Sequence, residues 1–346
     1  LEAQLDSTKA TPVEFEASLI DGEQQLTAEG HFYPPGKRED VIRTVDVAFR
    51  IRKFPLKTAE FFLGDGISST KGQLDGSLQL VGTENSTQLL GEVDLSGGTT
   101  VINYLGITVL IDETTIRARD DFFTVSGTTI RDIYGNVATI EGGVRHDDLR
   151  DFRLDASITS DRFLVLNTSK SNQDLYYGHC IGEVYTEFTG TFRQPNIYVN
   201  ATTGQGTRFF IQTEYEEEAG ELEYLRFVDK KKVQRKEKID EKYKGPRGLS
   251  LTLDLIATPD AEVKIIFDER AGDIIEGTGE GEIQLNVSRA GEVRMYGQYS
   301  ILQGNYLFTL PVVKKPFEVL SGSTLRWTGD PLNADIDIEA QYLGLT

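Results

Sequence analysis

Sulfur and imidazole are scarce in this sequence of 346 residues. It contains one cysteine, Cys180, and three histidines, His31, His146 and His179. A single cysteine excludes an intramolecular disulfide and is neutral about the compartment of the protein. The histidines stand far apart, and no Cys or His pair has the spacing of metal ligands. We therefore expect no metal site and no redox chemistry.

Positive charge is also in short supply. The chain has 36 Lys and Arg residues against 55 Asp and Glu residues, which gives a formal net charge of −19. Broad electrostatic attraction to nucleic acid or to anionic lipid headgroups is disfavoured by this balance. We expect no nucleic-acid partner, and we expect any partner to bind through shape or apolar contact.

Long apolar runs are missing, as is an initial methionine. No uninterrupted apolar run approaches the roughly 20 residues of a membrane-spanning helix. The chain begins at Leu1 without a basic and then apolar leader, and its last residues, "DIDIEAQYLGLT", stop just after a strand pattern. We interpret the chain as a piece of a longer protein, with any export signal or membrane anchor outside it.

No group of residues has the pattern of a catalytic site. His179 and Cys180 are adjacent, but neighbouring residues of a strand point to opposite faces. The "GTGEG" stretch from Gly277 to Gly281 resembles a phosphate loop, yet no helix pattern follows it, and we expect a turn or a bulge there. The many carboxylates are typical of solvated strand faces. We expect no enzyme activity, no catalytic residue and no cofactor.

Apolar residues at every second position are what the sequence has in abundance. The pattern recurs in Val13/Phe15/Ala17/Leu19, Val45/Val47/Phe49/Ile51, Leu78/Leu80, Ala138/Ile140, Leu154/Ala156/Ile158 and Leu249/Leu251/Leu253/Leu255. Turn signals separate the runs, at Asp21-Gly22, Pro34-Pro35-Gly36, Gly97-Gly98, Tyr134-Gly135-Asn136 and Thr328-Gly329-Asp330-Pro331. This pattern predicts an all-β chain of half-buried strands in one elongated, curved antiparallel β-sheet with an apolar concave face.

One charged segment interrupts the strands. Residues 214–247 carry an acidic block followed by a basic block, which is typical of a charged linker that is partly helical or disordered. A docking arm for another protein is the alternative. We divide the chain into a β-segment at 1–213, this linker or insertion at 214–247, and a C-terminal β-segment at 248–346.

The C-terminal segment carries a specific set of short motifs. They are Thr258-Pro259-Asp260-Ala261, Phe267-Asp268, Gly272-Asp273, the strand with Gly304, Tyr306 and Phe308, Gly322-Ser323, Trp327 and Gly329-Asp330-Pro331. Upstream stand "IRDIYGNVATIEGGVRHDDLRDFRLDAS", "LVLNT" and "LYYG". On these residues the chain closely resembles the C-terminal region of TamB-family proteins, in the form found in Bacteroidetes-like Gram-negative bacteria, over roughly residues 70 to 342.

The resemblance implies a fold and a function. TamB-like proteins share with AsmA-like and other bridge-like lipid-transfer proteins a U-shaped sheet, the β-taco, whose concave face is an apolar groove. It implies a periplasmic protein with an inner-membrane anchor, which is not in this fragment, and a TamA/BamA-like outer-membrane barrel as its partner. The implied function is to carry phospholipids between the inner and outer membranes in support of outer-membrane biogenesis.

We expect the alternating residues of the C-terminal segment to line this groove and to contact phospholipid acyl chains. The candidates are Val263, Ile265, Phe267, Ile283, Leu285, Val287, Met295, Tyr299, Ile301, Tyr306, Phe308, Ile336 and Ile338. The alternative is that they pack against each other across a closed sheet, because apolar strand faces are usually core.

Two other functional classes remain open. A parallel β-helix enzyme would show rungs at fixed spacing and a cluster of inward acids, and the sequence shows neither. A scaffold for the assembly of outer-membrane barrel proteins is harder to separate from a lipid carrier. It would offer exposed strand edges to nascent strands, and the same groove and edges would serve both functions.

Overall fold

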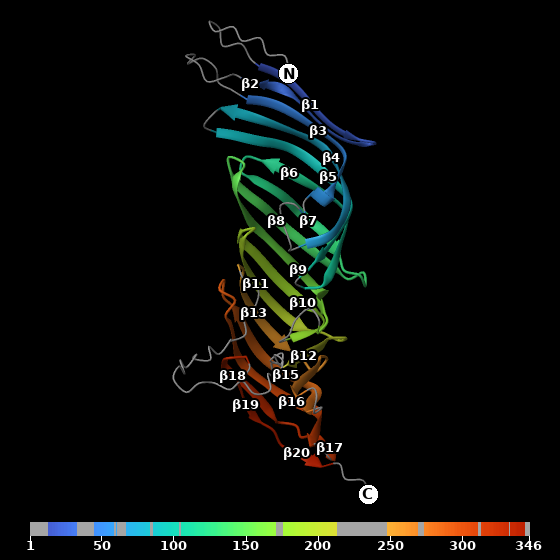
Figure 1. The fold of residues 1–346 in the computed structure, drawn as a ribbon, viewed down its shortest axis with the longest axis vertical. Coiled ribbons are helices and arrows are strands. Elements are labelled where there is room, and N and C mark those ends of the chain that lie inside the picture. Colours follow the sequence, from blue (N-terminus) through green and yellow to red (C-terminus); the bar gives the residue numbers. More distant parts are fainter. Residues whose placement is uncertain are drawn as a thin grey trace, which may run out of the picture.

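The chain folds into one long β-sheet. The computed structural model describes residues 13–32, 45–58, 60, 67–83, 86–103, 105–170, 176–212, 248–268, 273–310, 313–331 and 333–342. Twenty strands join in a single sheet, with β1 and β20 toward opposite ends of the long axis (Figure 1). The predicted all-β class and the elongated, curved form are confirmed.

The strands vary widely in length. They are β1 (Val13–Asp21), β2 (Gln24–Phe32), β3 (Val45–Pro55), β4 (Ile67–Thr83), β5 (Ser86–Ile102), β6 (Ile107–Arg119), β7 (Phe122–Arg131), β8 (Val137–Asp147), β9 (Arg150–Thr168), β10 (Tyr176–Thr191), β11 (Gln194–Thr203), β12 (Arg208–Gln212), β13 (Ser250–Ala257), β14 (Glu262–Asp268), β15 (Asp273–Val287), β16 (Val293–Leu310), β17 (Val313–Val319), β18 (Thr324–Gly329), β19 (Ala334–Asp337) and β20 (Ala340–Tyr342). A short 3-10 helix, η1 (Leu56–Thr58), follows β3.

Pairing in the sheet is mostly, but not entirely, antiparallel. β11 pairs with β13 and β12 pairs with β14 in parallel, so the sheet is mixed and the prediction of a purely antiparallel sheet is wrong. The period of two could not reveal this difference, because strands of either direction alternate in the same way.

Four rows of the sheet consist of two short strands placed end to end. β11 and β12 both pair with β10, and β17 and β18 both pair with β16. β13 and β14 form a row beside β15 in the same way, and β19 and β20 form the last row. The twenty strands therefore make sixteen rows. At about 4.8 Å per row the sheet is about 70 Å long.

Cross-strand pairing keeps apolar residues on one face along the whole sheet. Directly opposed residues of neighbouring strands lie on the same face. The pairs that carry this face across the sheet include Phe15–Gly30, Val47–Leu80, Val93–Ile116, Ile140–Ile158, Val199–Leu253, Leu253–Leu285, Leu285–Met295 and Tyr299–Leu325. We call the face that these residues share the apolar face, and the opposite one the polar face.

An extra residue in β5 changes which positions belong to the apolar face. Gly97 adopts a φ of 60°, and Lys71 and Gln73 of β4 pair on either side of a register shift beside it. The apolar face therefore passes from odd positions such as Leu95 to even positions such as Ile102. The predicted turn at Gly97-Gly98 is wrong, because the two glycines lie inside β5 and form a bulge rather than a strand end.

Glycines in mid-strand let the sheet bend. A Cβ on Gly297, whose φ is 122°, would lie 2.0 Å from the carbonyl oxygen of Glu282, and one on Gly281 would lie 2.1 Å from that of Gln298. No other residue fits such a close approach of two backbones. Glycine kinks and bulges are the devices that curve a β-sheet. The strands accordingly bend as they cross the long axis (Figure 1).

The sheet bends far enough for β6 to contact β9, although β7 and β8 lie between them. The backbone N–H of Asn167 donates to the carbonyl oxygen of Leu105 at 2.8 Å, beyond the end of the β7–β8 hairpin. Ile107 of β6 and Phe163 of β9 belong to the same buried cluster. The bend is therefore toward the apolar face, which makes that face concave.

Asp132 holds the β7–β8 turn against β9. Its carboxylate accepts hydrogen bonds from the backbone N–H groups of Tyr134 and Asn136, each at 2.9 Å, and from the side-chain amide of Asn136 at 2.7 Å. It also accepts the backbone N–H of Leu164 in β9 at 2.9 Å. Asp132 is 2% exposed, so these bonds are shielded from water.

The predicted charged linker, 214–247, lies outside the described residues. On its two sides, Gln212 pairs with Ile266 and Ser250 pairs with Asn196. The end of β12 and the start of β13 therefore lie at opposite ends of neighbouring rows, as the connection of parallel strands requires. The sheet passes from β11 to β13 without a break, and the division of the chain at this segment stays a prediction.

Replacing Asp132 by Ala should lower the free energy of unfolding by about 3 kcal/mol, because the buried N–H of Leu164 and the part-buried N–H groups of the turn lose their acceptor. Denaturant unfolding followed by circular dichroism measures the change. Asp112→Ala is the control: its ion pair with Arg131 is 3.0 Å long, and 70% of the Asp112 side chain is exposed. The control should lose less than about 1 kcal/mol. Equal losses in the two variants would contradict this account of Asp132.

Candidate functional site

The structure brings the predicted lining residues together on the apolar face of β13 to β19. Ile265 pairs with Ile275, which pairs with Tyr306, and Leu325 pairs with Ile336. The same face holds Val263, Ile265, Ile283, Leu285, Val287, Met295, Tyr299, Ile301, Tyr306, Phe308 and Ile336, and Ile338 packs against it just after β19. Phe267 belongs to β14, but its side chain lies outside the described residues.

In part of this face the apolar side chains pack against one another and are buried. Nine buried residues form what we call the C-terminal cluster: Ala257, Ile265, Ile275, Ile283, Tyr299, Ile301, Val319, Leu325 and Trp327. Their exposed fractions run from 1% to 8%. The alternative interpretation of the sequence, that these side chains pack against each other, therefore describes this part of the face.

The rest of the face keeps apolar surface exposed to solvent. Leu285, Met295, Tyr306 and Phe308 are half-buried, and Ile336 is 48% exposed. Farther from the C-terminus, Leu154, Ile158, Phe188, Val199, Leu251 and Leu253 are also half-buried. In β1, Leu19 is 62% exposed. A continuous apolar surface is thus open to a ligand beside the closed clusters.

Sequence reasoning missed several members of this site. Ile275, Val319, Leu325 and Trp327 lie in the C-terminal cluster, and Leu253 pairs with Leu285, yet none was among the predicted lining residues. The signal for them was present, because Leu325 and Trp327 alternate with polar residues in "TLRWTG". What the alternation could not indicate is which side chains the bend would bury.

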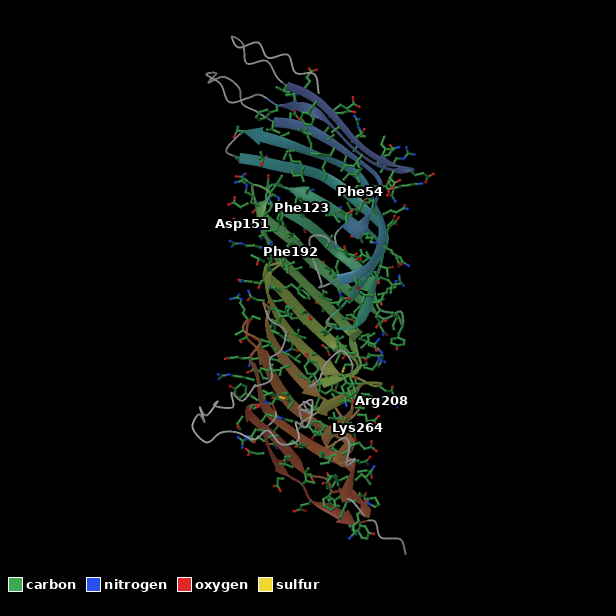
Figure 2. All side chains as sticks on the ribbon, viewed as in Figure 1. Phe54, Phe123, Asp151, Phe192, Arg208 and Lys264 are labelled. Atoms are coloured by element: carbon green, nitrogen blue, oxygen red, sulfur yellow. The ribbon has the colours of Figure 1, made fainter. Side chains whose placement is uncertain are left out.

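The polar face is held by exposed ion pairs between neighbouring strands. The guanidinium of Arg208 lies 3.1 Å from the carboxylate of Glu262, and the ammonium of Lys264 lies 2.6 Å from that of Glu276. Arg208 and Lys264 are labelled in Figure 2. Exposed pairs of this kind contribute about 0–1 kcal/mol each. Their main consequence is that one face of the sheet stays hydrated while the other attracts apolar groups.

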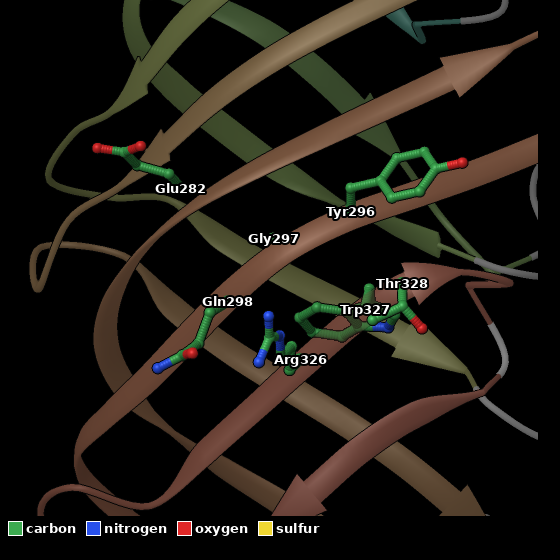
Figure 3. A pocket seen from close by; sticks show the side chains of 7 residues that line it. All are labelled: Glu282, Tyr296, Gly297, Gln298, Arg326, Trp327 and Thr328. Atoms are coloured by element: carbon green, nitrogen blue, oxygen red, sulfur yellow. The ribbon is translucent and has the colours of Figure 1, made fainter.

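A hollow on the polar face offers no enclosed binding site. It is lined by Glu282, Tyr296, Gly297, Gln298, Arg326, Trp327 and Thr328 of β15, β16 and β18 (Figure 3). Glu282, Gln298 and Arg326 lie opposite one another across the three strands, on the face away from the C-terminal cluster. Ligand pockets are mostly apolar and enclosed, so the apolar face is the stronger candidate.

Tyr299 is the one tyrosine of the C-terminal cluster, and its hydroxyl has no hydrogen-bond partner. Its ring covers the backbone of Gly279, because a Cβ built there would lie 2.7 Å from Cζ and 2.9 Å from the hydroxyl oxygen. Desolvation by burial raises the pKa of Tyr299 to about 12, so the hydroxyl keeps its proton at neutral pH. A buried polar group without a partner costs about 1–3 kcal/mol.

Two features of the described residues bear on metal binding and on the reactivity of Cys180. Within them, no group of three or more His, Cys, Asp or Glu side chains is placed to hold a metal ion. Burial raises the pKa of the Cys180 thiol to about 12, so the reactive thiolate is not formed at neutral pH. The His179 ring lies at 85° to the ring of Tyr134, with the two ring centroids 5.5 Å apart. The described part of the chain also contains no apolar helix of the length that a bilayer requires.

One bent sheet with a continuous apolar concave face and a hydrated outer face defines the class of β-groove proteins. The family comparison agrees: the model of the TamB C-terminal domain matches residues 126–343, more than half of the chain. The chain therefore belongs to the TamB family, and the predicted family is confirmed. No curated protein and no solved structure matches it. The Bacteroidetes-type form stays a prediction.

Membership of the family supports a role in the translocation and assembly module and in outer-membrane biogenesis. It implies a protein of the Gram-negative envelope and suggests a TamA-type partner within that module. The lipid cargo and the periplasmic route are finer statements, which need the argument from the apolar face.

Replacing Tyr299 by Phe should raise the free energy of unfolding of the ligand-free chain by about 1 kcal/mol, because it removes a buried hydroxyl without a partner and keeps the ring. The denaturant midpoint of delipidated protein measures this effect. Tyr296→Phe, on the polar face of the same strand, is the matched control and should leave the midpoint unchanged. A loss of stability in Tyr299→Phe would mean that the hydroxyl has a partner in the folded chain.

Proposed function

We propose that the chain carries phospholipids along its apolar face, as part of a periplasmic bridge between the inner and outer membranes. The observation that supports this proposal most directly is the continuity of the face. Register keeps it on one side of all sixteen rows, from Phe15 in β1 to Ile336 in β19. A binding site for one small ligand would not require an apolar surface of this length.

The energetics of an acyl chain on this surface favour binding without specificity. Each methylene that leaves water stabilises the complex by about 0.8 kcal/mol. Half-buried side chains such as Leu253, Leu285 and Met295 offer this contact in neighbouring strands. Because similar side chains follow row after row, a lipid that moves by one row exchanges one apolar contact for another, and the barrier between positions is low.

The headgroup remains in water at the open side of the groove. A net charge of −19 offers no general attraction for an anionic headgroup, and the ion pairs of the polar face lie on the other side of the sheet. Affinity on this proposal comes from the acyl chains. The proposed lipid transport requires no catalytic step, cofactor or metal in this chain.

The proposed route has an attachment at each membrane. We propose that an inner-membrane anchor lies outside this sequence and that a TamA/BamA-like outer-membrane barrel receives the other end. Support for the barrel comes from the family, which suggests a TamA-type partner.

A scaffold for outer-membrane barrel assembly is the second candidate. The observation that favours it is an open strand edge: among the described strands β1 pairs with β2 alone. Leu19 and Ile20 of β1 are also more than half exposed. An edge of this kind can add a strand from another chain. Crosslinks between β1 and a nascent barrel strand, in protein without bound lipid, would favour the scaffold.

Leu285→Asp tests the lipid carrier. Leu285 is half-buried on the apolar face, so a carboxylate at this position keeps contact with water and the fold should survive. The amount of lipid that co-purifies should fall at least tenfold, because acyl chains cannot cover an unpaired charge. Asn286→Asp is the control, since Asn286 is the next residue, faces the other side and pairs with Arg294. Lipid mass spectrometry of the purified chains measures the outcome. Normal lipid content in Leu285→Asp would contradict the proposal.

Ile265→Asp separates the closed cluster from the open surface. Ile265 is 3% exposed, so an unpaired carboxylate there should lower the free energy of unfolding by about 3–5 kcal/mol. Denaturant unfolding of Ile265→Asp and Leu285→Asp, side by side, measures the contrast. Equal stability of the two variants would show that the cluster is hydrated and that the groove is open there as well.

A further inference from the structure

Buried polar side-chain atoms without a hydrogen-bond partner are few in the described residues. They are His146 Nε2, Thr168 Oγ1 and the hydroxyl of Tyr299. His146 packs against the rings of Phe123 and Phe152 at the ends of β7 to β9. Tyr299 differs from it, because it stands in mid-strand on the apolar face, where a ligand is proposed to bind.

The surroundings of Tyr299 offer its hydroxyl nothing to bind. Tyr299 pairs with Gly281 on one side and with Leu325 on the other, and its side chain is 6% exposed. The one other polar side chain of the C-terminal cluster is satisfied within the chain, since Trp327 Nε1 donates to the carbonyl oxygen of Pro331 at 3.1 Å. A phenylalanine would fill the same space without an unsatisfied group. The hydroxyl therefore has no structural use in the ligand-free chain.

We infer that the Tyr299 hydroxyl donates a hydrogen bond to an ester carbonyl of a diacyl lipid. This bond provides one polar contact on an otherwise apolar surface. This inference rests on the proposed function and assigns a contact to it. A tyrosine that keeps its proton can donate, and an ester carbonyl can only accept. The ester also joins the acyl chain to the headgroup, so it is the polar atom that an acyl chain brings to the apolar face.

The strand places this contact beside the open apolar surface. Met295 and Tyr306 lie on the same face of β16, on either side of Tyr299, and both are half-buried. An acyl chain that crosses from one to the other passes over Tyr299, whose ring lies on the backbone of Gly279. The apolar contacts of the ligand then replace those that cover the hydroxyl in the ligand-free chain.

A pair of lipids that differ only in their carbonyl groups tests the inference. The probes are dipalmitoyl phosphatidylethanolamine and its ether-linked dihexadecyl analogue, each titrated against a fluorescent fatty acid bound to the delipidated 346-residue chain. We expect the unaltered chain to prefer the ester lipid about three- to tenfold, as one hydrogen bond predicts. Tyr299→Phe should bind both lipids with the affinity that the unaltered chain has for the ether lipid.

The controls separate this inference from the proposed function. Tyr296→Phe should keep the ester preference, because Tyr296 lies on the polar face. An ester preference that survives in Tyr299→Phe overturns the inference, as does equal affinity of the unaltered chain for both lipids, and in both cases lipid carriage still stands. If the unaltered chain binds neither lipid, the proposed function fails and the inference fails with it.

Discussion

Strand register is the constraint on which the rest of this structure depends. Side chains alternate with a period of two, so a slip of one residue between two strands would move every apolar side chain of a row to the polar face. The register places the apolar side chains of each row on the same face as those of the row before it. Tyr299 pairs with Leu325, and Leu285 pairs with both Leu253 and Met295. The groove spans sixteen rows because the register keeps the apolar side chains of every row on the same face.

Irregular positions preserve the groove rather than interrupt it. The bulge at Gly97 shifts the phase of the alternation so that both Leu95 and Ile102 remain on the inner side. Gly281 and Gly297 remove side chains where two backbones come close, which lets a sheet one layer thick bend toward its own apolar face. Curvature then buries part of that face without a second sheet, and the same bend leaves the neighbouring part accessible.

Burial divides the apolar face into a closed part and a part that is open to solvent. Ile265 and Leu325 are as dry as the core of a globular domain and stabilise the bend, whereas Leu285 and Met295 keep solvent contact and can bind a ligand. Tyr299 belongs to the buried part of the face, but its hydroxyl has no hydrogen-bond partner there. This mismatch between Tyr299 and its surroundings is what makes its hydroxyl a candidate for a polar contact with a bound ligand.

The sequence by itself determined the β-class, the two-sided character of the strands and the family, because alternation and short motifs are local signals. Runs such as Val263/Ile265 and Ile283/Leu285 could be assigned to one face without coordinates. Only the tertiary structure decided that β11 and β13 are parallel and that Gly97-Gly98 is a bulge. It also decided that Ile265 is buried while Leu285 is partly exposed to solvent. Strand direction and burial depend on how distant rows approach one another, and a period of two is the same for every such arrangement.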